Sequence, residues 1–211
     1  MTARTLFLNP NSSREITATL RRHIARGGWP SGCWAAAEVE AAPRIIGSAA
    51  DNARAEAALA CALPGLSEGF DRVVAMSSVD TGYEIVRERF GDAAHGFTRS
   101  VLALHRKLGR RLDVVTFDRG MTALYEAAFE ATGHAGVIDG WQVIDLAPAV
   151  IVAQPEIALD ALRERCEGFG GRQPVFVVGV VGIGLAAGLR DAGMRQVIDP
   201  VADLLAWLGE G

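Results

Sequence analysis

Short apolar runs alternate along this chain with stretches of helical period, and polar or glycine-containing turns separate most of them. Apolar runs of about four to eight residues are typical of strands that are buried on both faces of a parallel sheet. We predict strands at residues 5–8, 35–41, 72–76, 112–116, 143–146, 175–178 and 196–198. The strand-helix order predicts a parallel α/β fold.

Between these runs, apolar residues recur with the spacing of amphipathic helices. We predict helices at residues 14–26, 50–63, 83–90, 98–108, 121–132, 156–168, 186–192 and 201–208. Ser12 and Glu15 have the S-x-x-E spacing of a capping box, which satisfies free amides in the first turn of a helix. We therefore expect this pair to cap the first helix.

The loops after the predicted strands are the places to look for chemistry, because ligands of open parallel sheets bind beyond the carboxyl ends of the strands. Four such loops precede helices, at residues 9–13, 77–82, 117–120 and 179–184. The first two carry hydroxyl, amide and carboxyl side chains, namely Asn9, Asn11, Ser12, Ser77, Ser78 and Asp80. These residues either punctuate helix starts or form a cradle for an anionic or polar ligand.

The composition excludes several classes of protein. Half of the 211 residues are hydrophobic, and 21 basic against 25 acidic residues give a net charge of −4. This balance argues against a nucleic-acid or anionic-membrane partner. The first residues lack the apolar core of a signal peptide, and the uncharged stretch 173–189 is rich in glycine and shorter than the roughly 20 residues of a spanning helix. We expect a cytoplasmic protein.

Cysteine and glycine spacing indicate neither a metal nor a cofactor. Cys33, Cys61 and Cys166 form no C-x-x-C pair and fall outside the strand-end loops, so we expect no metal site and no cysteine nucleophile among them. The glycines at 179–184 have the order G-x-x-G-x-G, which differs from the dinucleotide fingerprint G-x-G-x-x-G. We interpret that loop as one whose backbone closely approaches a ligand or a neighbouring helix.

The histidines offer one weak site candidate. His23 and His105 stand beside arginines on charged helices, and we expect them to be solvated. His95 precedes a glycine and is retained as a candidate. A Ser/His/Asp arrangement at Ser77 would need His95 or His105 to be brought to it by the fold.

Taken together, these loops resemble the hydantoin racemase branch of the aspartate/glutamate racemase superfamily. Residues 8–13 followed by Thr17 resemble its opening signature, and residues 69–83 followed by Arg87 and Glu88 resemble its first catalytic loop. Residues 109–116 resemble the entry into its mid-chain strand. The second catalytic loop and the closing segment are matched by residues 175–182 and 197–201, so the resemblance runs through the whole chain in order.

The resemblance implies a fold and a site. It implies two similar parallel-sheet lobes with pseudo-two-fold symmetry and an inter-lobe cleft, the first lobe formed by residues 1–97 and 199–211 and the second by residues 98–198. It implies a cofactor-free site for a small-molecule substrate in a homo-oligomer. The residues expected to bind substrate are Asn9, Asn11, Ser12, Ser78, Thr116, Phe117, Val180, Val181 and Gly182.

The family's catalytic pair of cysteines is replaced in this chain. The resemblance implies that two thiols exchange protons with opposite faces of the substrate's α-carbon, and these positions align with Ser77 and Val180. A serine hydroxyl is much less acidic than a thiol of pKa about 8.5, and valine transfers no proton, so the two-thiol mechanism is excluded.

We therefore expect an isomerase or lyase of altered mechanism. It would act on a small carboxylate or cyclic ureide through an enolate-like intermediate, with Ser77 and Asp80 as catalytic candidates. Two alternatives are a catalytically inactive protein that binds a small acid in a racemase-like cleft, and a hydrolase with Ser77 as its nucleophile.

Overall fold

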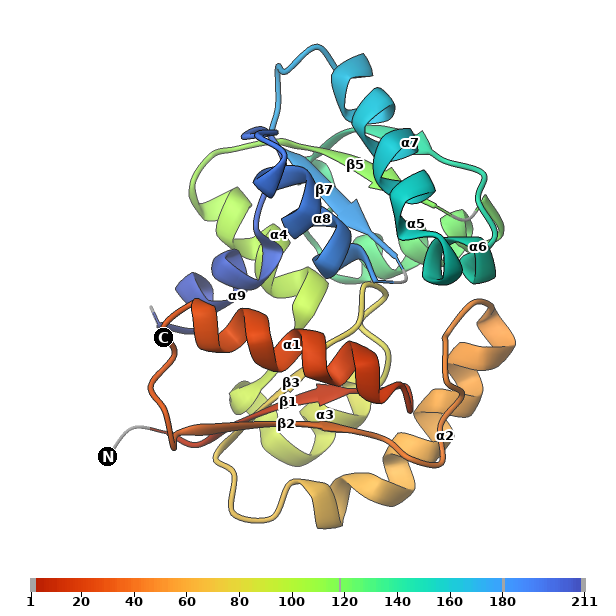
Figure 1. Cartoon of the computed structure of the whole chain (residues 1–211). Helices are drawn as coiled ribbons and strands as arrows, with labels where there is room; N and C mark the ends of the chain where they lie inside the picture. The colour runs from red at the N-terminus through yellow and green to blue at the C-terminus, as the bar shows by residue number, and fades with distance from the viewer. Residues whose placement is uncertain (1–2, 118, 180, 210–211) are drawn as a thin grey trace. The chain divides into compact units, whose positions relative to one another are not determined.

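The computed structural model describes residues 3–117, 119–179 and 181–209, apart from the side chains of residues 148, 149 and 152 (Figure 1). Contacts within the chain divide it into two compact units, Met1–Ser100 and Val101–Gly211, called the first and second unit below. Residues 199–211 are predicted to belong to the first lobe, and those of them that the structure describes, 199–209, group with the second unit in this division.

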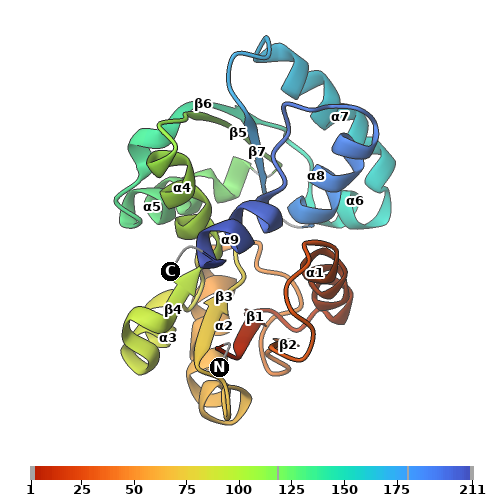
Figure 2. The same ribbon diagram turned by 90° about the vertical axis from the view of Figure 1, so that its left-hand side faces the viewer.

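The first unit is built on a parallel sheet with the strand order β2-β1-β3-β4 (Figure 2). Its strands are β1 (Thr5–Asn9), β2 (Trp34–Glu38), β3 (Arg72–Ala75) and β4 (Ala94–Gly96). Its helices are α1 (Arg14–Arg26), α2 (Ala49–Leu66), α3 (Tyr83–Phe90), the short 3-10 turn η1 (Gly91–Ala93) and the start of α4 (Phe97–Lys107).

Alternate residues of β1 face the two sides of this sheet, as the period of a strand requires. Leu6 and Leu8 belong to the cluster that includes Leu59 of α2 and Val86 of α3. Phe7 lies on the other side, edge-on to the Trp34 ring with the ring centroids 6.1 Å apart. Both faces of the sheet are therefore covered, which explains why β1 is buried along its whole length.

The second unit contains another parallel sheet, in the order β6-β5-β7. Its strands are β5 (Leu112–Thr116), β6 (Ile138–Val143) and β7 (Val175–Val178). Its helices are the rest of α4, α5 (Thr122–Ala131), α6 (Pro148–Ala153), α7 (Pro155–Gly168), α8 (Gly182–Asp191) and α9 (Pro200–Gly209), with 3-10 turns η2 (Arg119–Met121) and η3 (Ala135–Val137).

The core of the second unit has the same two-sided arrangement. Val115 and Val177 pack in one cluster with Leu162 of α7 and Leu189 of α8. A separate aromatic stack joins Phe129 of α5 to Phe176 of β7, with ring centroids 6.3 Å apart.

The two units repeat one topology, which confirms the expectation of two similar α/β lobes. In each, the first strand is central, the second pairs on one side of it and the third on the other. The third strand of each then pairs with a short later segment, β4 in the first unit and Val197, bridged to Val175, in the second. The pseudo-two-fold symmetry and the cleft stay predictions.

Several predicted elements need correction. The strand predicted at 143–146 lies instead at Ile138–Val143. This segment is an edge strand, so its half-exposed residues include Asp139 and Gly140 and give no apolar run. Of the predicted strand 196–198, the structure keeps the isolated bridge at Val197. Strand β4 and helix α6 were not predicted, because three and six residues are too few to show a period.

Helix α8 begins at Gly182, four residues before the predicted start at residue 186. Glycine is a poor helix former, which is why the prediction excluded this turn. Here the small residue is required by packing, because a Cβ on Gly182 would lie 3.1 Å from the carbonyl oxygen of Val177.

Candidate functional site

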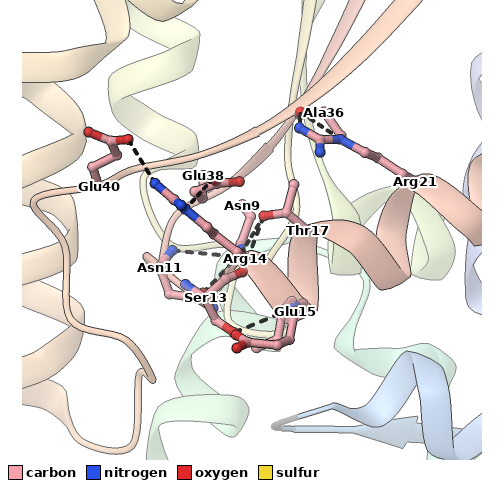
Figure 3. Close-up of polar contacts among 11 residues, drawn as sticks. Asn9, Asn11, Ser13, Arg14, Glu15, Thr17, Arg21, Ala36, Glu38 and Glu40 are labelled. Carbon is pink, nitrogen blue, oxygen red and sulfur yellow. Dashed lines mark hydrogen bonds and ion pairs between the residues drawn. The ribbon is translucent and has the colours of Figure 1, made fainter.

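Asn9 ends strand β1 and organises the loop that follows it (Figure 3). Its side chain is fully buried, and its Nδ2 donates to Asn11 Oδ1 at 2.9 Å, to Thr17 Oγ1 at 3.2 Å and to the Ser13 carbonyl at 3.3 Å. Its Oδ1 accepts the Asn11 amide at 3.2 Å. The Asn9 amide is thus engaged inside the protein, and it acts on any ligand through the loop it shapes.

Asn11 has one side of its amide engaged in the loop. Its Oδ1 accepts hydrogen bonds from Asn9 Nδ2 and from the Ser13 amide, both at 2.9 Å. Its Nδ2 makes no hydrogen bond to any residue that the structure describes, and the residue is half-buried. Asn11 therefore offers a positioned amide donor at the end of the first strand. Neighbouring Ser12 donates its backbone amide to the Pro43 carbonyl.

The predicted capping pair is wrong by one residue. Helix α1 is capped by Ser13, whose Oγ accepts the Ile16 amide at 3.4 Å and donates to Glu15 Oε2 at 2.9 Å. The reason is that the bond from the Ser13 amide to Asn11 holds Ser13 in an extended conformation at the helix start.

Two arginines near this loop, Arg14 and Arg44, are paired with acids. Arg14 lies 3.7 Å from Glu38 and 3.6 Å from Glu40 (Figure 3). Arg44 lies 3.1 Å from Glu15. The arginine of each pair is exposed, so these pairs contribute little to stability. They do neutralise the local positive charge, so the first strand end presents amides and hydroxyls rather than a cation.

Ser77 stands two residues beyond the end of β3, the neighbour of β1 in the sheet. Its Oγ accepts the Val79 amide at 3.3 Å and lies 2.9 Å from Thr81 Oγ1. Thr81 Oγ1 in turn donates to Asn52 Oδ1 of α2 at 2.7 Å. The half-buried Ser77 hydroxyl is therefore one end of a chain of hydroxyl groups.

Asp80 faces the start of α4, and its carboxylate is held there by three donors. Oδ1 accepts the Thr98 amide at 2.9 Å, while Oδ2 accepts the Arg99 amide and Arg99 Nε, each at 3.1 Å. Burial raises the pKa of Asp80 to about 6, although the Arg99 guanidinium and the two amides act in the opposite direction.

The contacts around Asp80 hold the Ser77 loop against the start of α4. Thr98 Oγ1 donates back to the Ser78 carbonyl at 2.8 Å, and the Arg99 guanidinium lies 3.3 Å from the centre of the Tyr83 ring. Any Cβ at Gly96 would lie 2.6 Å from Asp80 Oδ1, so a glycine is needed beneath the carboxylate. The geometry gives Asp80 a positioning role, and its predicted catalytic role stays a prediction.

No base is bonded to the Ser77 hydroxyl within the described part of the chain. His95 lies on β4 in register with Val74, and burial, together with the charge of Arg72, lowers its pKa to about 4. His105 is buried rather than solvated as predicted, because its Nε2 bonds Asp203 of α9 at 3.0 Å. The Ser/His/Asp arrangement is therefore not formed among these residues.

Thr116 ends β5, the central strand of the second unit. Its carbonyl accepts the Ile144 amide at 2.7 Å, but its fully buried Oγ1 makes no hydrogen bond to the residues described. Such a hydroxyl is costly unless a partner satisfies it, so it is a candidate for a ligand contact. Phe117, predicted to bind substrate, lies in the hydrophobic core of this unit.

The loop after β7 is held together by its own backbone. Gly179 has φ +127°, and a Cβ there would lie 3.0 Å from the Phe117 ring and 3.3 Å from the Tyr125 hydroxyl of α5, which confirms the expected close approach to a neighbouring helix. Val181 has φ +53° and packs against the core of the unit, and the Gly182 amide donates to the Gly179 carbonyl at 3.0 Å. Val180 lies outside the described residues.

Sequence reasoning missed the residues that hold the Ser77 loop. Asn52 lies in an alanine-rich helix, while Thr98 and Arg99 belong to a helix of ordinary amphipathic pattern. Each reaches the loop from 18 to 29 residues away along the chain. The one feature of the sequence that hints at these contacts is Gly96, whose missing side chain makes room for Asp80.

Comparison with known proteins decides the family. The model of the Asp/Glu/hydantoin racemase family matches residues 6–206. The chain belongs to this family.

Solved racemase and isomerase structures share the fold. Allantoin racemase from Klebsiella pneumoniae is 20% identical with a TM-score of 0.78, covering 98% of this chain and 86% of its own. Allantoin racemase from Pseudomonas fluorescens is 18% identical with the same TM-score, covering 98% and 89%. The maleate isomerase Iso from Pseudomonas putida S16 is 15% identical with a TM-score of 0.65, covering 99% and 92%.

Two further findings complete the comparison. No curated protein matches the chain. None of the helices in the described segments is both long and apolar enough to cross a membrane.

Proposed function

We propose that this member of the racemase family is a cofactor-free isomerase or lyase. It acts on a small carboxylate or a cyclic ureide through an enolate-like intermediate. The observation that carries the proposal is the placement of Ser77. It stands two residues beyond the third strand of the first unit, as residue 180 stands two residues beyond the third strand of the second. The proposal takes these two positions as those of the proton-transfer groups, which is what the sequence resemblance implies.

Neutral donors would bind the oxygen atoms of the substrate. Asn11 Nδ2 is held in place by the bonds that its Oδ1 makes, and Thr116 Oγ1 lacks a partner within the described residues. Oriented donors of this kind stabilise the negative charge that develops on an enolate oxygen, each by a few kcal/mol. The paired arginines nearby supply no free positive charge.

Racemisation, an isomerase reaction, and decarboxylation, a lyase reaction, differ in the proton transfers that they need. Racemisation needs a base on one face of the α-carbon and an acid on the other, and Val180 supplies neither. Loss of carbon dioxide leaves the electron pair of the broken C–C bond on the α-carbon, so it needs no base. One proton must then be returned, and Ser77 Oγ is the group placed to return it and to regain a proton from water.

Binding without chemistry is the second candidate. It is favoured by one observation, which is that Ser77 Oγ contacts an amide and the Thr81 hydroxyl but no acid or base in the described structure. The same observation gives the Ser77 hydrolase no support.

The test is to incubate the protein with 5-methylhydantoin in deuterium oxide and, separately, with methylmalonate. We expect either deuterium at C5 of the hydantoin or release of carbon dioxide from the acid, each above the rate in buffer. The Ser77→Ala variant should lose this activity. The matched Ser31→Ala variant, in the exposed loop before β2, should keep it. Binding of either compound without reaction selects the second candidate, and absence of binding contradicts both.

A further inference from the structure

The Ser77 hydroxyl belongs to a chain of hydrogen bonds whose direction is fixed at its far end. Thr81 Oγ1 has a single proton, and it donates that proton to Asn52 Oδ1 at 2.7 Å. The contact of 2.9 Å between Thr81 Oγ1 and Ser77 Oγ must then use the proton of Ser77. Ser77 is therefore the donor in this pair, and its proton points away from the strand end.

Burial makes this direction costly to reverse. Thr81 is 1% exposed, so its oxygen has no access to bulk water. If Ser77 turned its proton toward a ligand, the buried Thr81 oxygen would lose its donor. The Val79 amide already donates to Ser77 Oγ at 3.3 Å, which leaves one lone pair of that oxygen for a further contact.

Helix α2 holds the far end of the chain rigidly. Asn52, Glu56 and Leu59 stand one turn apart on one face of α2. Asn52 bonds Thr81, Glu56 Oε1 accepts the Gly82 amide at 3.5 Å, and Leu59 packs so closely on Gly82 that a Cβ there would lie 2.1 Å from it. The loop is thus anchored to α2 at its last two residues.

We propose that Asn52 and Thr81 are specificity-determining residues, which make Ser77 a hydrogen-bond acceptor toward the ligand. A ligand group facing Ser77 is then an N–H, as in a cyclic ureide or imide. A carboxylate, which at neutral pH has acceptors alone, would meet a lone pair there. This inference rests on the proposed function, because it requires Ser77 to contact the ligand, and it selects the ureide over the free acid. Return of a proton by Ser77 in the lyase reaction would first require its hydroxyl to turn away from Thr81, so the inference favours the isomerase over the lyase within that function.

The test compares two probes by calorimetry, 5-methylhydantoin as the N–H donor and methylmalonate as the carboxylate. The wild-type protein should bind the hydantoin more tightly. Thr81→Val removes the acceptor for the Ser77 proton and frees this proton for the ligand. We expect the ratio of the two dissociation constants to shift toward methylmalonate by about two- to tenfold. Thr81→Ser keeps the hydroxyl and should leave the ratio unchanged.

A second variant protects the test against a folding defect. Asn52→Ala removes the end of the chain from a half-buried surface position of α2 and should shift the ratio in the same direction as Thr81→Val. A ratio that stays constant in both variants, or that moves toward the hydantoin, overturns the inference. So does a wild-type preference for methylmalonate, which would mean that the chain runs the other way, from Asn52 Nδ2 toward the ligand.

Ser77→Ala separates this failure from the failure of the proposed function. If it weakens hydantoin binding while Thr81→Val leaves the ratio unchanged, the proposed site stands and the specificity inference falls. If neither probe binds the wild-type protein, or if Ser77→Ala changes the affinity for neither, the proposed function falls and the inference falls with it.

Discussion

Asn9 and Thr116 occupy the same place in the two units and have opposite environments. Each is the last residue of a central strand, and each carbonyl accepts the amide of the residue that follows the second strand, Val39 in one unit and Ile144 in the other. The Asn9 side chain bonds three groups of its own unit, while Thr116 Oγ1 bonds no described residue.

The loops after the third strands also differ between the two units, in how many polar side chains hold them. In the first unit, hydroxyls, a carboxylate and an asparagine hold the loop at Ser77 and Asp80. In the second, the loop closes on its own backbone and packs Val181 against the core. One topology therefore carries a polar, tightly bonded strand end in one unit and an apolar strand end in the other. The bonds of Asn9 are explained by the stability that they give to the fold. No such role explains the buried Thr116 hydroxyl, which bonds no described residue.

The largest expected effect comes from making the two loops alike. The double variant Ser77→Cys, Val180→Cys places a thiol at both positions where the family resemblance implies one. Deuterium exchange at C5 of 5-methylhydantoin should rise about 100-fold or more over either single variant, because proton transfer by a positioned group contributes at least that much. Inversion should accompany the exchange. Equal rates in the single and double variants would refute the assignment of these positions.

Alkylation provides the control for this experiment. Iodoacetamide should inactivate the double variant and leave the wild-type protein unaffected. Cys61 is exposed and remote in sequence from the strand-end loops, and burial raises the pKa of Cys166 to about 12, which keeps that thiol unreactive. Loss of wild-type binding or activity on alkylation would place the site elsewhere.

The next largest difference is expected between substitutions of the two central-strand residues, in their effect on the free energy of unfolding. Asn9→Ala removes the partner of Asn11, Ser13 and Thr17 and should destabilise the protein by about 2–4 kcal/mol. Thr116→Val has nearly the same shape and removes a hydroxyl that bonds no described residue, so its effect should stay below about 1 kcal/mol in either direction. Urea unfolding measures both. A comparable loss in the two variants would show that Thr116 is as structural as Asn9.

The raised pKa of Asp80 in the first unit predicts that the stability of the protein depends on pH. Its folded-state pKa is raised to about 6, above the value of about 4 expected in the unfolded chain, so the folded protein retains the proton over this range. The contribution of Asp80 to stability should therefore be full below about pH 4 and decline as the pH rises through about 6.

The test is to measure the free energy of unfolding of the wild-type protein and of Asp80→Asn across this pH range. The difference between the two values should shrink as the pH rises. Asp92→Asn, at an exposed position of the same unit, serves as the matched substitution and should not show it. A difference that grows with pH would mean that the Arg99 pair outweighs burial.

The smallest expected effect concerns Asn11. Asn11→Asp keeps the oxygen that accepts from Asn9 and Ser13 but replaces the amide donor, so the loop should be retained while a ligand contact is lost. Affinity for a ligand oxygen should fall by about 0.5–1.5 kcal/mol for a neutral ligand and by more for an acid. Calorimetry with 5-methylhydantoin measures it. An unchanged affinity would remove Asn11 from the binding site.

Much of the fold could be predicted from local pattern. Strands β1, β5 and β7 are buried along their whole length, so apolar runs predicted each of them to within one residue. Helix α3 was predicted with its full bounds because Gly82, at φ +76°, and Gly91 delimit it. The edge strand β6 escaped, since half-exposed residues leave no such run.

The sequence by itself determined the family, most of the order of strands and helices and the loops that carry the candidate residues, because these depend on neighbours along the chain. Tertiary structure decided what each side chain does. It buried His105 against Asp203, turned Asp80 toward α4 and placed Asn52 at the end of the Ser77 chain. A hydrogen bond depends on where two atoms meet in space. Partners that lie 18 to 98 residues apart in the sequence leave no local pattern that predicts their meeting.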